Sequence, residues 1–347
     1  MSLDNSPIHF QWKNEDVVRR FRTGVSLHGH TLHSRESLDF IERATARTPW
    51  FSGAIRKQMR RYREKTGRDL DLSRAWWTPP LSALQAWKVE KAQIEGLGLA
   101  AQVSLSDHDN ADAGVHLSVL EKTRQSPVSV EWTVPWRETF FHVGLHNLPV
   151  DRISRIMPEL ARLTERPLEG EVADMLAALH DNSSVLIIWN HPLWDEGQIG
   201  AEPHRKCAES FLARMGSFVH AFELNGLRPW KENQDVIEFA EAVSFPVISG
   251  GDRHGREPNA CLNPSNAASF RNSWRRFAAM DGATCCSCRS TGMRFNCGLC
   301  RISATFWRTI RRTAWAGLRG ATGRFTGRTM GARNRCANCG AGNRRRW

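Results

Sequence analysis

The stretch Val25 to Ser34, VSLHGHTLHS, joins an apolar run to two histidines, His28 and His30, that are separated by one small residue. The apolar residues that precede His28 indicate a buried β-strand. Because side chains two positions apart on a strand point to the same face, we expect both imidazoles to reach one metal ion. The stretch therefore predicts a strand that carries metal ligands at its carboxyl end.

Later segments repeat this arrangement of an apolar run that carries histidine or carboxylate. They are VSLSDHD with Asp107 and His108, VSVEWTV with Glu131, FHVGLHN with His142 and His146, VLIIWNHP with His191, and FPVISGGDRHG with Asp252 and His254. Imidazole and carboxylate ligands suit borderline divalent metals such as zinc, manganese and iron. The set predicts a metal-dependent hydrolase.

Segments with the apolar spacing of helices alternate with these strands. The expected helices cover residues 81–95, with an exit at Gly96 and Gly98, and residues 150–164, 168–180, 203–215 and 233–243. Alternating strands and helices favour a parallel sheet, and ligands at successive strand ends favour a closed or nearly closed β/α barrel. The fold class is therefore α/β.

The ordered set of motifs resembles that of the PHP (polymerase and histidinol phosphatase) superfamily over residues 25–256. The motifs that carry the resemblance are HxH at 28–30, SDHD at 106–109, Glu131, HVGL at 142–145, NHP at 190–192 and GGDRH at 250–254. The resemblance implies a distorted (β/α)7-type barrel with two or three divalent metal ions (Mn, Zn or Fe) at the carboxyl ends of its strands. It also implies hydrolysis of a phosphoester by metal-activated water.

Carried over by position, the resemblance implies three groups of ligands. They are His28, His30, Glu131 and Asp252 around one ion, Glu131, His142 and His191 around a second, and His108 with His254 around a third. Glu131 and Asp252 are thus catalytic candidates, because carboxylates that bridge cations keep them close enough to clamp phosphoryl oxygens. Asp107 is a third candidate, since it could orient a neighbouring imidazole by a hydrogen bond. His146 is an alternate ligand for the position given to His142.

The chain departs from the family after its HxH motif, where many members have Ser-Asp-Gly and this sequence reads Ser34-Arg35-Glu36. Glu36 could replace the missing aspartate at the third ion, or it could be an exposed glutamate paired with Arg35 or Arg43. His33 and Arg253 are candidates for substrate binding. Glu223 and Asn225 end a further apolar run, which resembles a family strand that lines the site without binding metal.

An insertion at residues 35–78 contains a basic segment, IRKQMRRYREKTGRD. Its basic residues are Arg56, Lys57, Arg60, Arg61, Arg63, Lys65 and Arg68, with the acid Glu64 among them. One interpretation is a solvated helical face, and the other is a basic lid that attracts phosphate or nucleic acid. The sequence leaves both open.

Charge divides the chain near residue 270. Residues 271–347 contain 17 of the 48 Lys+Arg and one of the 36 acids, so this tail carries +16 and residues 1–270 carry −4. We expect a lead-in at 1–24, a barrel at 25–270 and an Arg/Cys-rich tail at 271–347 that is not a native domain, as in GC-rich coding sequence read in a shifted frame. The competing interpretation is a nucleic-acid-contacting zinc module built on Cys297-x-x-Cys300 and Cys336-x-x-Cys339 with Cys285, Cys286 and Cys288.

The sequence also indicates the localisation of the protein and its binding partners. The amino terminus has neither the basic flank nor the apolar core of a signal peptide, and no apolar run is long enough to span a membrane, so a cytoplasmic protein with no membrane partner is expected. The expected substrate is a phosphorylated small molecule, a nucleotide or a nucleic-acid end. The alternative function is nucleic-acid binding by the tail beside an inactive barrel. The oligomeric state is not indicated by the sequence.

Overall fold

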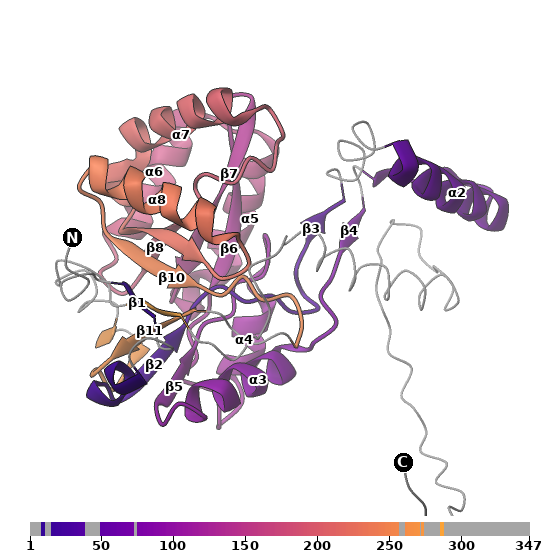
Figure 1. The fold of residues 1–347 in the computed structure, drawn as a ribbon. Helices are drawn as coiled ribbons and strands as arrows, with labels where there is room; N and C mark the ends of the chain where they lie inside the picture. Colours follow the sequence, from indigo (N-terminus) through magenta and orange to yellow (C-terminus); the bar gives the residue numbers. More distant parts are fainter. Residues whose placement is uncertain are drawn as a thin grey trace, which may run out of the picture.

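The computed structural model describes residues 8–10, 15–38, 49–72, 75–256, 261–270, 272–273 and 285–287, whose strands form two large sheets and one small one (Figure 1). The first sheet has the order β1 (Ile8–Phe10), β12 (Cys285–Ser287), β11 (Cys261–Ser265), β2 (Thr23–Ser26), β5 (Ala100–Val103). The second has the order β10 (Val247–Gly250), β9 (Ala221–Asn225), β8 (Leu186–Asn190), β7 (Thr139–His146), β6 (Val130–Trp136). The small sheet pairs β3 (Glu36–Ser37) with β4 (Trp76–Trp77).

The strands are not all parallel, which corrects the expectation from the sequence. β2 with β5, β8 with β9, and β9 with β10 pair in parallel, but β7 is antiparallel to both β6 and β8. The reversal occurs at a two-residue turn between Trp136 and Thr139, which face each other across the β6–β7 pair. A connection this short can join only antiparallel strands.

The two large sheets do not form one closed barrel in the described part of the chain, so the expected closure is also corrected. Two isolated bridges nevertheless link their ends. Gly29, beyond β2, pairs with Arg253, beyond β10, and His108, beyond β5, pairs with Glu131 on β6. Both links lie where the predicted ligands are, so the candidate site occupies the place where the sheets meet.

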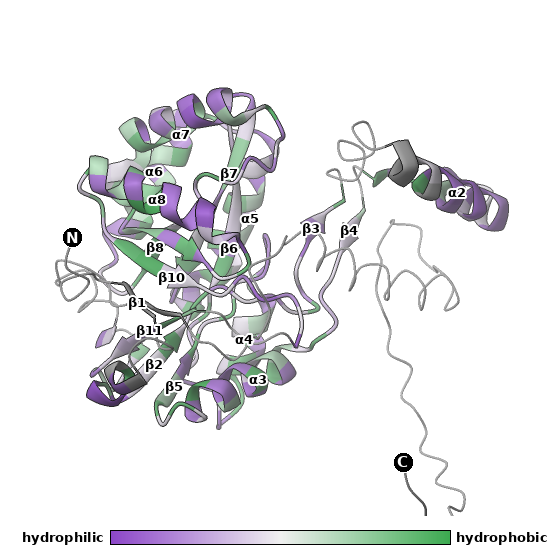
Figure 2. Cartoon of the chain, in the orientation of Figure 1, coloured by the Kyte–Doolittle hydropathy of each residue, from purple (hydrophilic) through white to green (hydrophobic). Residues whose placement is uncertain are grey.

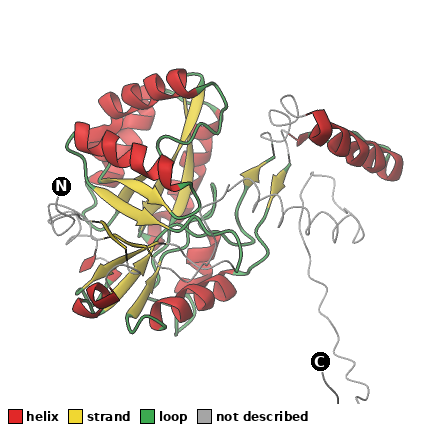
Figure 3. Cartoon of the chain, in the orientation of Figure 1, coloured by secondary structure: helices red, strands yellow, loops and turns green. Residues whose placement is uncertain are grey.

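Helices cover the outer faces of the sheets (Figure 3), and the molecule is a mixed α/β protein. The bounds of the helical elements are η2 Glu15–Arg20, α2 Pro49–Thr66, α3 Ala83–Glu95, α4 Asp112–Ser118, η4 Val150–Arg152, α5 Ile153–Glu165, α6 Glu169–His180, α7 Ala201–Met215, η5 Gly216–Phe218 and α8 Trp230–Ala242. α3 begins at a capping box in which Ser82 and Gln85 exchange side-chain to backbone hydrogen bonds, and it ends at Gly96. The helices expected from apolar spacing are therefore confirmed.

Apolar residues form separate cores on the two sides of the second sheet. On its outer side, side chains of β6 to β9 such as Trp132, Trp189 and Phe222 pack with α5, α6, α7 and α8. Between the two sheets, Val25 and Leu27 pack against residues of β8, β9 and β10 and against Phe270. These apolar side chains fill the space between the two sheets, next to the strand ends that carry the candidate ligands, and so support the site.

Some expectations for the ends of the chain lie outside the described residues. Both CxxC pairs of the tail and most of residues 271–347 lie outside them. The boundary at residue 270 therefore stays a prediction. Of the few described residues beyond that boundary, Ser273 donates a hydrogen bond to Gln102 (2.8 Å), and β12 pairs with β1 and β11. Among the described helices, none combines the length and apolar character that crossing a membrane requires.

Candidate metal centre

His28, His191 and Asp252 lie just beyond the ends of β2, β8 and β10, at points where the backbone turns sharply, whereas Glu131 and His142 lie on β6 and β7. β2 ends at Ser26, so His28 and His30 do not lie on the strand as the sequence suggested. The φ angles of His28, His191 and Asp252 are 63°, 30° and 48°, in a region that non-glycine residues seldom occupy. These turns bring the imidazoles of His28 and His30 together all the same, with ring centroids 5.0 Å apart.

Glu131, on β6 and completely buried, lies at the centre of the candidate ligands. Its Oε2 atom lies 3.0 Å from Nε2 of His28, 3.3 Å from Nε2 of His30 and 3.2 Å from Nδ1 of His108. Its Oε1 atom lies 3.2 Å from Nε2 of His191 and 3.6 Å from Nδ1 of His142. The two carboxylate oxygens thus face two different groups of imidazoles.

Asp252, which follows β10, is the second carboxylate at this centre. Its Oδ1 atom lies 3.2 Å from Nε2 of His30 and 3.6 Å from Nε2 of His28, on the side of these rings that also faces Glu131. Asn225 donates a hydrogen bond to Oδ2 (3.1 Å) and fixes the carboxylate. His28 and His30 are therefore flanked by two buried carboxylates.

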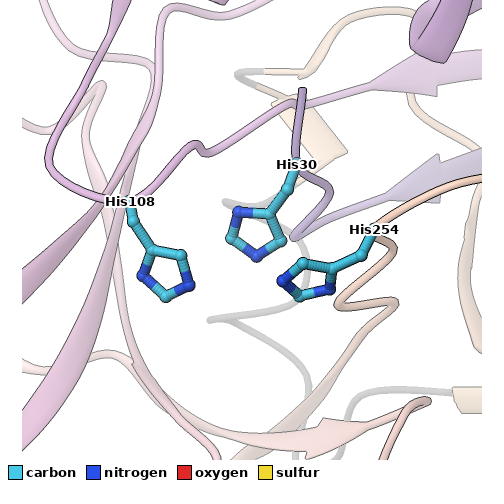
Figure 4. Close-up of side chains that lie close together, drawn as sticks. All are labelled: His30, His108 and His254. Atoms are coloured by element: carbon cyan, nitrogen blue, oxygen red, sulfur yellow. The ribbon is translucent and has the colours of Figure 1, made fainter. Parts of the chain in front are cut away.

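A third group consists of the rings of His30, His108 and His254, which come from the ends of three strands and converge on one space (Figure 4). The ring of His30 lies 4.6 Å from that of His108 and 4.2 Å from that of His254. Nδ1 of His254 lies 3.0 Å from the backbone oxygen of Asp252 and can donate a hydrogen bond to it. Nε2 of His254 lies 3.4 Å from Oε2 of Glu36, so the structure places Glu36 beside this group.

We call the eight residues that these contacts bring together the strand-end cluster. Its members are His28, His30, His108, Glu131, His142, His191, Asp252 and His254. The cluster contains four overlapping triads. Within each triad, one ligand atom from every residue lies within 4.8 Å of those of the other two residues. The triads are His30, His108 and His254; His28, His30 and Glu131; His28, His191 and Asp252; and His108, Glu131 and His142.

Glu223, on β9, supports the cluster from behind, in the site-lining position that the sequence suggested. Its Oε1 atom lies 2.5 Å from Nδ1 of His28, and its Oε2 atom accepts hydrogen bonds from the backbone of His191 (3.0 Å) and from Asn225 (2.9 Å). A proton on Nδ1 of His28 that is held by Glu223 leaves the lone pair of Nε2 directed at Glu131 and Asp252. A carboxylate in this position typically fixes the tautomer of a metal-bound histidine.

Gly250, on β10, leaves the space that the Glu223 side chain fills. A Cβ atom at position 250 would lie 1.7 Å from Oε1 of Glu223, a distance that no structure tolerates. Asn190 similarly supports Glu131, because its side-chain amide donates a hydrogen bond to Oε1 (2.9 Å). The orientation of both carboxylates is thus set by neighbouring strands.

The electrostatics of the strand-end cluster favour positive charge at its centre. Burial would lower the pKa of His28, but the carboxylates of Glu131, Glu223 and Asp252 raise it well above its usual range. Burial would likewise raise the pKa of Glu131 and of Asp252, but the surrounding imidazoles lower both well below their usual range. The two carboxylates therefore stay ionised in a buried place, which is costly unless a cation lies beside them.

The donor set fits divalent metal ions. Nε2 of His28, Nε2 of His30 and Oε2 of Glu131 are buried and, among the described residues, have no well-aligned hydrogen bond, although the two nitrogens lie 3.0 and 3.3 Å from the oxygen. Such a group of mutually facing imidazole and carboxylate atoms is the donor set of zinc, manganese and iron sites. The arrangement can hold metal ions, and its carboxylates can lie between them.

Asp107 lies in a different environment from the one expected. Both of its oxygens accept hydrogen bonds from Thr31, one from the backbone and one from the hydroxyl (2.7 Å), so Asp107 holds the turn that follows His30 and not an imidazole. Burial raises the pKa of Asp107 to about 7. This carboxyl group is thus a support for the backbone at the site.

Arg253, predicted to contact substrate, is also placed differently. It is 3% exposed, its Nε atom lies 2.8 Å from Oε1 of the buried Glu90, and it donates a hydrogen bond to Gln93. A buried guanidinium requires such a carboxylate partner, and this pairing ties the loop that carries Asp252 to α3.

Two other predicted residues are not part of the ligand triads found among the described residues. His33 is half-buried, and its ring contacts that of His116 at 4.8 Å. His146, the alternate ligand, lies within hydrogen-bond distance of the Ser104 hydroxyl (2.8 Å), and burial lowers its pKa to about 3. His146 is part of none of the ligand triads found among the described residues.

The sequence reasoning missed Arg228, which follows β9. Its guanidinium stacks on the ring of Trp194 at 3.7 Å, and its Nη2 atom lies 3.8 Å from Oδ2 of Asp252. It is 8% exposed, and its Nε atom has no hydrogen-bond partner among the described residues. The nearby AFELNG motif indicates the end of β9 but carries no signal for Arg228. Glu196, whose Oε2 atom lies 3.7 Å from Nδ1 of His142, had no signal either.

Structures similar to this chain include proteins whose names refer to a metal-dependent phosphoesterase. PsfC of Pseudomonas syringae is 13% identical over 85% of this chain and 99% of that one, with a TM-score of 0.43. A Bifidobacterium adolescentis protein provisionally named a metal-dependent phosphoesterase is 14% identical over 57% of this chain and 92% of that one, with a TM-score of 0.36. A two-domain Bacteroides vulgatus protein that contains a predicted PHP-like metal-dependent phosphoesterase is 12% identical over 74% of this chain and 62% of that one, with a TM-score of 0.41.

The sequence itself matched no family model and no curated protein. The functional argument therefore rests on the side chains of the strand-end cluster.

Proposed function

We propose that the protein is a metal-dependent phosphoesterase whose strand-end cluster binds two or three divalent ions. The observation that supports this proposal most strongly is the position of Glu131, whose two carboxylate oxygens face imidazoles on opposite sides at 3.0 to 3.6 Å. A carboxylate between two groups of imidazoles suits a site with two neighbouring cations. Bound ions there would supply a water molecule of lowered pKa and neutralise the charge of the phosphoryl group.

The proposal assigns three ligand groups within the strand-end cluster. One is His28, His30, Glu131 and Asp252, the second is Glu131, His142 and His191, and the third is His108, His254 and Glu36. The strands that present these groups, β2, β5 and β6 to β10, would then correspond to those of a distorted (β/α)7-type barrel that stays open, with its two sheets linked by the isolated bridges.

Other residues of the chain have supporting roles in this proposal. Glu223 keeps the Nδ1 proton on His28, and Asn190 fixes Glu131. Arg228, buried and stacked on Trp194, replaces Arg253 as the candidate for contact with a phosphoryl oxygen. An immobilised guanidinium beside the cluster offers donors in the fork geometry that phosphate accepts.

The test is hydrolysis of phosphomonoesters and phosphodiesters by the full chain after chelation, with and without added Mn²⁺, Zn²⁺ or Fe²⁺. We expect activity that depends on added metal and falls by at least roughly 10²-fold in Glu131→Gln, which keeps the shape of the side chain and removes its charge. Glu165→Gln, an exposed position at the end of α5, is the matched control and should retain the wild-type rate.

Two results would contradict the proposal. One is hydrolysis that persists unchanged after the metal is removed, and the other is a Glu131→Gln variant with the wild-type rate. Either would show that hydrolysis does not depend on metal held by the strand-end cluster. Absence of hydrolysis with every metal and substrate would instead leave nucleic-acid binding without catalysis as the better account of the chain.

A further inference from the structure

A basic arm extends from the molecule beside the strand-end cluster. We define the arm as residues 35–38, 49–72 and 75–78, which comprise β3, α2 and β4. Figure 1 shows α2 standing away from both large sheets, joined to them through β3 and β4. A small apolar core holds α2 in place, because Ile55 and Met59 pack with residues such as Leu38, Leu72 and Trp77.

The solvent side of α2 is strongly basic. Its exposed basic residues are Arg56, Lys57, Arg60, Arg61, Arg63 and Lys65, with Arg68 just beyond the helix. The helix contains one acid, Glu64, and Figure 2 shows the hydrophilic colouring that this composition gives. Ile55 and Met59 lie on the opposite side, so the basic side chains cover the face that is left in solvent.

This concentration of one charge costs free energy in the isolated helix. Arg56 with Arg60, Lys57 with Arg61, and Arg61 with Lys65 are like-charge pairs four residues apart. Each such pair destabilises a helix, because neighbouring charges of the same sign repel each other. A solvated helix under no other demand would alternate its charges, whereas a polyanion bound along this face would remove the repulsion.

The arm reaches the strand-end cluster through both of its strands. Glu36 of β3 lies 3.4 Å from Nε2 of His254, and the ring of Trp77 of β4 stacks on that of His254 at 5.6 Å. The same two residues, Glu36 and Trp77, are paired across the β3–β4 ladder. The arm that carries α2 is therefore in direct contact with the cluster.

We propose that the arm binds the phosphodiester backbone of a nucleic acid and brings a phosphoester of that strand to the strand-end cluster. This inference rests on the proposed function for the part that concerns hydrolysis, and it names the substrate class. The 18 residues of α2 extend over about 27 Å. Phosphates repeat every ~3.4 Å along one strand of a duplex, so a helix of this length can face several of them.

An acidic membrane surface fits the arm less well. A helix that binds a bilayer surface inserts an apolar face between the lipid headgroups. On α2 the described apolar side chains Ile55 and Met59 are already packed within the arm. The fully exposed side chains that the structure describes on α2 are all charged, which suits a nucleic-acid backbone.

The test compares binding of a short 5′-phosphorylated single-stranded DNA to the full chain and to the variant R56Q/K57Q/R60Q/R61Q, by fluorescence anisotropy at several salt concentrations. Glutamine has a helix propensity close to that of arginine and lysine, so α2 should persist. We expect binding to weaken roughly tenfold or more at low salt, and the slope of log Kd against log salt concentration to fall by up to about 3. The matched control is K122Q/R124Q/R152Q/R155Q, which removes four exposed charges from the body.

Each outcome supports or overturns the proposal. Binding that is lost in the arm variant and kept in the control supports it. Equal binding by the arm variant and the wild type overturns it, and so does an equal loss in the control. Arm-dependent binding of phosphatidylserine vesicles without binding of DNA would overturn it in favour of a lipid partner. Hydrolysis of a small phosphomonoester by the wild type is measured in parallel, and its absence would contradict the proposed function while leaving the binding result standing.

Discussion

The strand-end cluster and the basic helix α2 hold their charges in opposite ways. In the cluster, carboxylates and imidazoles are buried and lie within 3.0 to 3.6 Å of one another, whereas α2 exposes a row of charges of one sign to solvent. Buried charges are stable only with compensation at short range, while exposed charges are screened and cost little. The properties of the cluster must therefore depend on the exact positions of its side chains, whereas those of the helix must depend on its total charge.

The largest effect is expected at Glu223, a residue of the cluster's surroundings that touches no proposed substrate atom. Glu223→Gln should lower kcat/KM for a phosphoester roughly 10- to 100-fold, because a neutral amide no longer holds the Nδ1 proton of His28. Metal affinity measured by calorimetry should fall with it. Glu238→Gln, the same change at an exposed position of α8, is the control and should have no effect. A Glu223→Gln variant with the metal affinity of the wild type would show that orientation of His28 is not required.

The contrast also explains what the sequence could and could not predict. Strands and helices were recovered from apolar spacing, and histidines chosen because they accompany apolar runs lie close together in the fold. The reversed direction of β7 was not predicted. The turn after Trp136 begins with Arg137, which adopts a φ of 54°, and it lacks the glycine or asparagine that usually signals such a turn.

Contacts between distant segments explain the remaining differences. Nothing in the GGDRH motif shows that Arg253 is paired with Glu90, a residue of α3 far away in the sequence. Arg228 was missed for the same reason, since its importance comes from Trp194 and Asp252 on other segments. Position along the chain predicts which residues reach a strand end, but the neighbour that takes up each charge is set by packing.

A second prediction concerns the buried His146 and the pH dependence of stability. His146 has a pKa of about 3 in the folded protein, lowered from 6.5 by burial, so it binds a proton on unfolding between these pH values. The free energy of unfolding of the metal-free protein should therefore decrease as the pH falls from 6.5 towards 3, with this residue contributing about 1.4 kcal/mol per pH unit. In His146→Gln the slope from urea denaturation at several pH values should be smaller by that amount. Identical slopes in the two proteins would show that His146 is not buried in its neutral form.

The smallest effect is expected at Glu36, where the arm meets the strand-end cluster. Glu36→Gln should lower the metal content by about one ion per chain and reduce turnover by roughly tenfold or less, because the groups around His28 and His191 stay complete. Elemental analysis of the purified protein measures the first effect. Glu64→Gln, the same change on the exposed face of α2, should alter neither quantity. Unchanged metal content in Glu36→Gln would assign Glu36 to the arm alone.

The close approach of Glu223 to Gly250 has a consequence for how the sequence can vary. A side chain at position 250 and a glutamate at position 223 cannot occupy the same space, since a Cβ atom would lie 1.7 Å from the carboxylate oxygen. An alanine at position 250 would therefore force the Glu223 carboxylate away from Nδ1 of His28. A mutation on β10 would thus act on a histidine that follows β2, through the carboxylate that selects the tautomer of that histidine.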